Sequence, residues 1–291
     1  MERGPVHQDF ADLVFHVLAH VSATAALPAS LFDPGYVQFA EAALGSSQAR
    51  QLGDDCRTLG RLLQTHERLA KVQRLAWLHA SVEEFAASEQ RPLSELRPAE
   101  VGRPDLLTAL RLDELALTEI LRCAVALERP HHAQLPRCEA VPVELAPWLT
   151  TLASVAPFLA AAEVDCVRAL CWRGRVAGRS IWVGLPASVA GPSVEHAAFQ
   201  AAHEATVAEL LEAARRAGVS LPERGLERAA LWLFATRCRR AGLEAKHDVW
   251  FRRMTLPADW TTAVGEKLGL APLPPELSGL ADRCLASPLA R

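Results

Sequence analysis

The stretch VDCVRALCWRGRVAGRSIWVGL, residues 164–185, interrupts a chain whose pattern is otherwise helical nearly throughout. Its β-branched and aromatic residues fall in two short runs, with Gly174 and Gly178 between them. Runs of this kind around turn-forming glycines predict two strands joined as a β-hairpin. Because a lone hairpin is marginally stable in water, we expect it to pack on helices.

Apolar residues recur at helical spacing on both sides of this hairpin. The pattern predicts helices near 8–26, 35–45, 48–88, 104–128, 142–163, 194–217 and 224–241. We therefore predict a mainly α fold, a helical bundle-like architecture with one small hairpin packed on it. Periodicity lapses at 130–141, which predicts a linker between an N-terminal helical region, 1–129, and a C-terminal region, 142–291, unless the chain forms one compact domain.

The composition excludes several classes of protein. The chain has 291 residues, 50% of them hydrophobic, and a formal net charge of −3. This is enough for a sizeable core and offers no general attraction to nucleic acid. The seven cysteines are scattered with no CxxC pair, as expected for reduced thiols, and the N-terminus lacks the pattern of a signal peptide. We expect a cytoplasmic protein that binds neither nucleic acid nor membrane.

The first predicted helix carries a stripe of ionisable residues beside its apolar face. Asp12, His16 and His20 recur every four residues, so they lie on one line along the helix. Two imidazoles one turn apart can bind one metal ion, with Asp12 as a ligand or as the partner of a general base. The alternative interpretation is a polar face that meets water or the polar edge of another helix.

A second pair of histidines, His196 and His203, lies on the predicted helix 194–217. Both fall on its apolar face together with Gln200, and Glu204 follows His203 directly. Buried imidazoles must find hydrogen-bond partners or a metal ion. This helix therefore predicts either satisfied structural histidines or half of a metal site.

The two helices together suggest one shared site, because metal sites in helical bundles are built from inward histidines and carboxylates on facing helices. We expect the following residues to converge as ligands of a divalent metal ion: His16, His20, His196 and His203. Zn, Fe or Mn would suit such donors. Glu204 and Asp12 are the candidates for the catalytic acid or base.

The other histidines and short motifs of the chain give little further indication of function. His131 and His132 fall in the predicted linker, where we expect a surface position. The dipeptide His247-Asp248 resembles the HD dipeptide of helical metal-dependent phosphohydrolases, but over these two residues only, and the surrounding pattern does not match. No GxxxxGK[ST], GxGxxG or GxSxG motif occurs, which argues against phosphate-loop nucleotide binding and α/β-hydrolase chemistry.

Two functions from different classes follow. The first is a metal-dependent hydrolase or oxidase built on the shared histidine site. The alternative is a non-catalytic interaction module, an accessory or recognition subunit of another enzyme. In that case the edge of the hairpin would take a peptide strand, and tryptophans of the C-terminal half would contact a protein partner.

Overall fold

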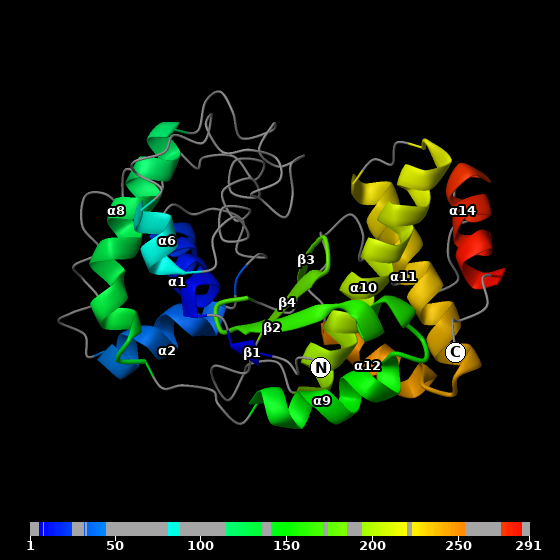
Figure 1. Ribbon diagram of the computed structural model, residues 1–291. Coiled ribbons are helices and arrows are strands. Elements are labelled where there is room, and N and C mark those ends of the chain that lie inside the picture. The colour runs from blue at the N-terminus through cyan, green and yellow to red at the C-terminus, as the bar shows by residue number, and fades with distance from the viewer. Residues whose placement is uncertain are drawn as a thin grey trace.

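Helices dominate the structure, a computed structural model, and a small sheet lies between two groups of them (Figure 1). The structure describes residues 6–7, 9–24, 32, 34–44, 81–87, 115–135, 141–170, 174–184, 194–219, 223–253 and 275–286. The predicted mainly α fold with a small β element is confirmed. None of the described helices is long and apolar enough to cross a membrane.

The helices form one group on each side of the sheet. The first group comprises α1 (Asp9–Thr24), α2 (Pro34–Leu44), α6 (Val82–Ala87) and α8 (Leu115–His132). The second comprises α9 (Val141–Leu152), the short 3-10 helix η6 (Pro157–Ala161), α10 (Val194–Ala217), α11 (Glu223–Arg240), α12 (Glu244–Arg253) and α14 (Pro275–Ala286). In the second group, α10 contacts α9, α11, α12 and α14 and also the sheet, so it is the central helix of this half.

The sheet has four strands in the order β1-β2-β4-β3, and its pairing corrects the predicted hairpin. The strands are β1 (Val6–His7), β2 (Glu163–Val167), β3 (Arg175–Ala177) and β4 (Ser180–Gly184). We expected the runs that contain β2 and β4 to form the hairpin, but these two strands are parallel. The hairpin instead joins β4 to β3, a three-residue strand too short to show a pattern, through a turn with Gly178 at a φ of 59°.

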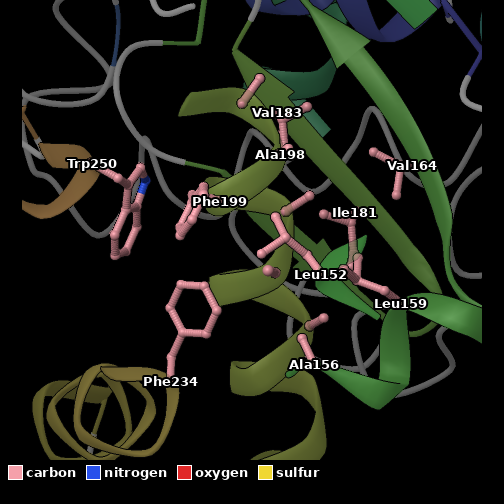
Figure 2. Close-up of a cluster of buried hydrophobic side chains, with 14 of the residues drawn as sticks. Leu152, Ala156, Leu159, Val164, Ile181, Val183, Ala198, Phe199, Phe234 and Trp250 are labelled. Atoms are coloured by element: carbon pink, nitrogen blue, oxygen red, sulfur yellow. The ribbon is translucent and has the colours of Figure 1, made fainter. Parts of the chain in front are cut away.

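The side chains of the sheet alternate between two separate cores, as the pleat requires. On one face, Val164, Cys166, Ile181 and Val183 pack with residues of α9, α10 and α11 (Figure 2). On the other face, Val167 and Trp182 pack with α1 and α8. The sheet therefore separates the core around α1 from the core around α10.

Local sequence sets one helix end as expected and fails to set another. Gly242, at a φ of 72°, ends α11 as predicted, and the Leu243 amide donates to the Cys238 carbonyl at 2.8 Å. The predicted helix 104–128 was expected to end at residue 128, which was wrong, because α8 continues through Pro130 to His132. The start of the predicted linker is therefore helical, and residues 136–140 lie outside the described residues.

Candidate functional site

The four histidines predicted to share one site lie in two clusters on opposite faces of the sheet. His16 and His20 lie on α1, whereas His196 and His203 lie on α10. We call the first group the N-terminal cluster: Asp12, His16, His20, Tyr36, Glu128, His132 and Arg168. We call the second the C-terminal cluster: His196, Gln200, His203, Glu204, His247 and Trp250. In the described part of the chain, no three His, Cys, Asp or Glu side chains are placed to hold one metal ion.

Asp12 joins α1 to the end of β2 through a buried ion pair with Arg168. One carboxylate oxygen, Oδ1, accepts from the Arg168 backbone amide at 2.6 Å. The other, Oδ2, accepts from Arg168 Nε at 2.6 Å and lies 2.5 Å from the terminal nitrogen Nη2. Both side chains are buried, so the guanidinium compensates a carboxylate that would otherwise be costly to bury.

Helices α1 and α8 run antiparallel and exchange two contacts between a histidine and a carboxylate. His132 Nε2 lies 2.9 Å from Asp12 Oδ2, and His16 Nε2 lies 3.4 Å from Glu128 Oε2. Each helix thus carries a carboxylate and, four residues later, a histidine, and each pair faces the other pair in reverse order. Arg168 Nη2 also donates to His132 Nε2 at 2.7 Å, so Arg168 contacts both members of the Asp12–His132 pair.

His16 lies between two partners of different chemistry. Its Nδ1 is 2.8 Å from the Tyr36 hydroxyl, and its Nε2 faces the Glu128 carboxylate. Burial lowers the pKa of His16 from 6.5 to about 4, against the opposing effect of Glu128, so the imidazole is neutral at pH 7. Burial raises the pKa of Glu128, but the hydrogen bond from His16 and the neighbouring histidines more than offset this, and the net shift is downward. An ionised Glu128 accepts from Nε2, which leaves Nδ1 to accept from Tyr36.

His20 extends the N-terminal cluster by one helical turn. Its ring centroid is 4.3 Å from that of His16, and its Nδ1 donates to the His16 carbonyl at 2.9 Å. Burial lowers the pKa of His20 as well. These two imidazoles therefore form a neutral pair inside the core.

The C-terminal cluster is arranged around the indole of Trp250 on α12. The ring centroids of His196, His203 and His247 lie 6.2, 5.5 and 5.4 Å from that of Trp250. Phe199 and Phe234 pack beside the indole and make the surroundings apolar (Figure 2). Burial lowers the pKa of His247 to about 4, so this imidazole too is neutral at pH 7.

Hydrogen-bond partners are scarce in the C-terminal cluster. In the described part of the chain, the following buried atoms have none: Gln200 Oε1, both ring nitrogens of His203, His247 Nε2 and Trp250 Nε1. Each such atom costs about 1–3 kcal/mol relative to a bonded one. The concentration of these atoms around one indole distinguishes this cluster from the N-terminal one.

Glu204 lies at the border of the C-terminal cluster. Its Oε1 accepts from Gln200 Nε2 at 2.9 Å and lies 3.5 Å from His203 Nδ1. Burial raises the pKa of this carboxyl, but His203, Arg175 and Gln200 together lower it further, so Glu204 is ionised at pH 7. The predicted acid or base is thus a carboxylate beside His203, whereas Asp12 is held by Arg168 in the other cluster.

Five residues of these clusters were not placed in the predicted site from the sequence. Tyr36, Glu128 and Arg168 were given no role, and His247 was noted only for its HD dipeptide with Asp248. The expected surface position of His132 was wrong because this side chain is buried. The spacing of Glu128 and His132 repeats that of Asp12 and His16, but the predicted helix end at 128 hid this repeat. Tyr36 is the single tyrosine of the chain, but the sequence alone does not indicate that its hydroxyl contacts His16.

Two of the tryptophans proposed from the sequence as contacts for a protein partner, Trp182 and Trp250, are buried in the core. Trp182 donates from Nε1 to Asp165 Oδ2 at 3.0 Å, and Trp250 is enclosed by aromatic rings. Trp172 and Trp260 lie outside the described residues. Exposed aromatic anchors are therefore not formed by Trp182 or Trp250.

The comparisons with known proteins leave the two clusters as the basis for any assignment of function. No family model, curated protein or solved structure matches this chain.

Proposed function

We propose that the chain is a hydrolase whose acid–base centre is the N-terminal cluster. The observation that supports this is the order of three side chains: the Glu128 carboxylate, the His16 imidazole and the Tyr36 hydroxyl. In catalytic triads the same order of groups lets an imidazole take the hydroxyl proton while the carboxylate orients the ring. The neutral state of His16 at pH 7 leaves it able to accept that proton.

The proposed reaction is the hydrolysis of an ester by water. As the water oxygen bonds to the carbonyl carbon, its proton passes to the Tyr36 oxygen and the Tyr36 hydroxyl proton passes to His16 Nδ1. The leaving alkoxide takes a proton back along the same path when its bond to carbon breaks. Tyr36 and His16 carry the proton, and Glu128 positions His16. All three side chains are buried, so the substrate reaches them only through a local opening of the chain.

The test is the hydrolysis of p-nitrophenyl acetate by the full chain and by two variants with the same substitution. His16→Gln should lower the rate above buffer by roughly 100-fold or more, the range for loss of an acid–base group. The matched control is His131→Gln, because His131 Nδ1 also lies near Glu128 Oε2, at 3.6 Å, but the hydroxyl of Tyr36 is bonded to His16. Circular dichroism would confirm that both variants are folded.

Two results would contradict the proposal. The first is a wild-type rate equal to that of buffer, and the second is a His16→Gln rate equal to that of His131→Gln. Tyr36→Phe gives an independent check, because it removes the hydroxyl alone and should lower the rate as His16→Gln does. A rate that is unchanged in Tyr36→Phe would remove the tyrosine from the reaction.

A metal-dependent hydrolase or oxidase is less well supported at the N-terminal cluster. Both ring nitrogens of His16 have partners, and both oxygens of Asp12 face Arg168. A metal ion would have to displace these bonds before it could bind. Histidine nitrogens without such partners lie in the C-terminal cluster instead.

The cysteines bear on the compartment in which this reaction would occur. Cys238 and Cys284 are buried free thiols, and burial raises the pKa of Cys238 to about 12, which makes that thiol unreactive. Unpaired cysteines are typical of a reducing compartment. A cytoplasmic location is therefore part of the proposal, and the redox state of these thiols in the native cell would test it.

A further inference from the structure

Two histidines of the C-terminal cluster come from different helices and share the same surroundings. His203 on α10 and His247 on α12 both pack against Trp250, at centroid distances of 5.5 and 5.4 Å. Both also pack against Phe234, at 6.4 and 5.4 Å. The two imidazoles therefore lie on one aromatic surface, close enough for a charge on His203 to lower the pKa of His247.

Each of these histidines has a carboxylate near one ring nitrogen and no partner at the other. His203 Nδ1 lies 3.5 Å from Glu204 Oε1, and His247 Nδ1 lies 3.6 Å from Asp248 Oδ1. Nε2 of both rings is buried without a hydrogen-bond partner in the described part of the chain. Histidines that bind metals have this arrangement, because the carboxylate orients the ring and makes its outer nitrogen more basic.

Gln200 adds an unpartnered oxygen donor on the same helix as His203. It precedes His203 by one helical turn, its side chain is buried, and its Nε2 is held by Glu204 at 2.9 Å. This bond directs the amide nitrogen to Glu204, and Oε1 has no partner among the described residues. One helix thus supplies an imidazole nitrogen and an amide oxygen that are both unused.

We propose that His203 Nε2, His247 Nε2 and Gln200 Oε1 bind one divalent transition-metal ion. Zn²⁺ is the probe of choice, because it accepts nitrogen and oxygen donors with three protein ligands and leaves one position for water. The site is distinct from the proposed hydrolase centre, which lies on the other face of the sheet. Metal binding would also remove the cost of three unpartnered polar atoms in an apolar core.

The experiment is a calorimetric titration of the untagged, chelator-treated full chain with ZnCl₂. One saturable site per chain is expected in the wild type. His203→Gln and His247→Gln should each weaken it by roughly 100-fold or more, since even residues that only orient a ligand contribute 10–100-fold. The matched control is His16→Gln, which changes a buried histidine of the N-terminal cluster and should leave Zn²⁺ affinity unchanged.

A second measurement keeps the test decisive if a variant does not fold. Co²⁺ added to the wild type should give the visible absorption of a four-coordinate site, and an equimolar amount of Zn²⁺ should abolish it. The proposal is overturned by wild-type protein that takes up no metal ion at a saturable site, in which case buried water satisfies these atoms. It is equally overturned by unchanged affinity in the double variant His203→Gln/His247→Gln.

Discussion

The N-terminal and C-terminal clusters both bury histidines in a helical core, but they differ in whether the imidazole nitrogens have hydrogen-bond partners. In the first, the ring nitrogens of His16 face Tyr36 and Glu128, and the one buried ion pair is tightly bonded. In the second, imidazole nitrogens lie against indole and phenyl rings without partners. The difference separates a network in which the ring nitrogens of His16 are bonded from a cluster in which several polar atoms have no partner among the described residues, and the two proposals rest on this difference.

The physical basis of this contrast is the sheet. Val167 and Trp182 direct one face to α1, and Val164 and Ile181 direct the other to α10. Asp12 can reach Arg168 because α1 packs at the end of β2. The N-terminal cluster thus obtains its cation from the strand, whereas the C-terminal cluster is enclosed by aromatic residues of helices.

The largest effect is expected for Arg168→Met, which leaves Asp12 buried without its cation. The free energy of unfolding should fall by about 3–5 kcal/mol, as for other buried ion pairs that lose one partner. Urea denaturation measures this, with the exposed Arg215→Met as control, for which we expect little change.

The double variant Asp12→Asn/Arg168→Met should recover part of the loss, because no buried charge is left alone. A loss no larger than that of the control would show that the ion pair does not support the N-terminal cluster.

Acidification should weaken the N-terminal cluster through His16. The folded pKa is about 4 and the unfolded value is 6.5, so between these two values the unfolded chain binds a proton that the folded chain does not. The stability from His16 is complete above pH 6.5 and is lost as the pH falls towards 4, by roughly 3 kcal/mol in all.

The measurement is denaturation at several pH values in wild type and His16→Gln. Between pH 4 and 6.5, the slope of the unfolding free energy against pH should be smaller in the variant by about 1.4 kcal/mol per pH unit. Identical slopes would mean that His16 is not held in its neutral form. The protons bound by other groups cancel in this comparison, provided that the variant keeps the same fold.

Replacing one histidine in each cluster by phenylalanine compares them directly in metal-free protein. His16→Phe should cost roughly 2 kcal/mol, because Tyr36 and Glu128 each lose the contact that they make with His16. His247→Phe should be neutral or stabilising by up to about 1 kcal/mol, because it removes an unpartnered nitrogen from an aromatic environment. Thermal denaturation of the two variants decides the matter. Equal losses in both would mean that the histidines of the two clusters are equally well satisfied.

The sequence predicted the elements of these clusters better than their assembly. The stripe of Asp12, His16 and His20 and the inward face with His196 and His203 are local, periodic features. The inward face is buried as expected, and the stripe, for which a water-facing position was the alternative, is buried too. Whether the four histidines converge depends on which helices face each other. The sheet, in which β2 pairs with β4, separates the core around α1 from the core around α10, and this arrangement depends on contacts between residues far apart in the sequence. Glu128 and His132 were missed because helix α8 continues through Pro130, which local propensity disfavours.

The smallest expected effect concerns the joint between α11 and α12, which sets where His247 lies relative to α10. Gly242 has a φ of 72°, where an L side chain is strained, so Gly242→Ala should lower the free energy of unfolding by about 1 kcal/mol. Gly279→Ala is the matched control, because it lies inside α14 with no atom within 4 Å of an added Cβ and should stabilise by up to about 1 kcal/mol. Helix α12 starts directly after this joint, and His247 lies in its first turn. A shift of this turn would therefore move His247. Gly242→Ala should then weaken Zn²⁺ binding more than Gly279→Ala does. Equal Zn²⁺ affinity in the two variants, with the stability difference intact, would show that packing around Trp250 rather than the joint holds His247 in place.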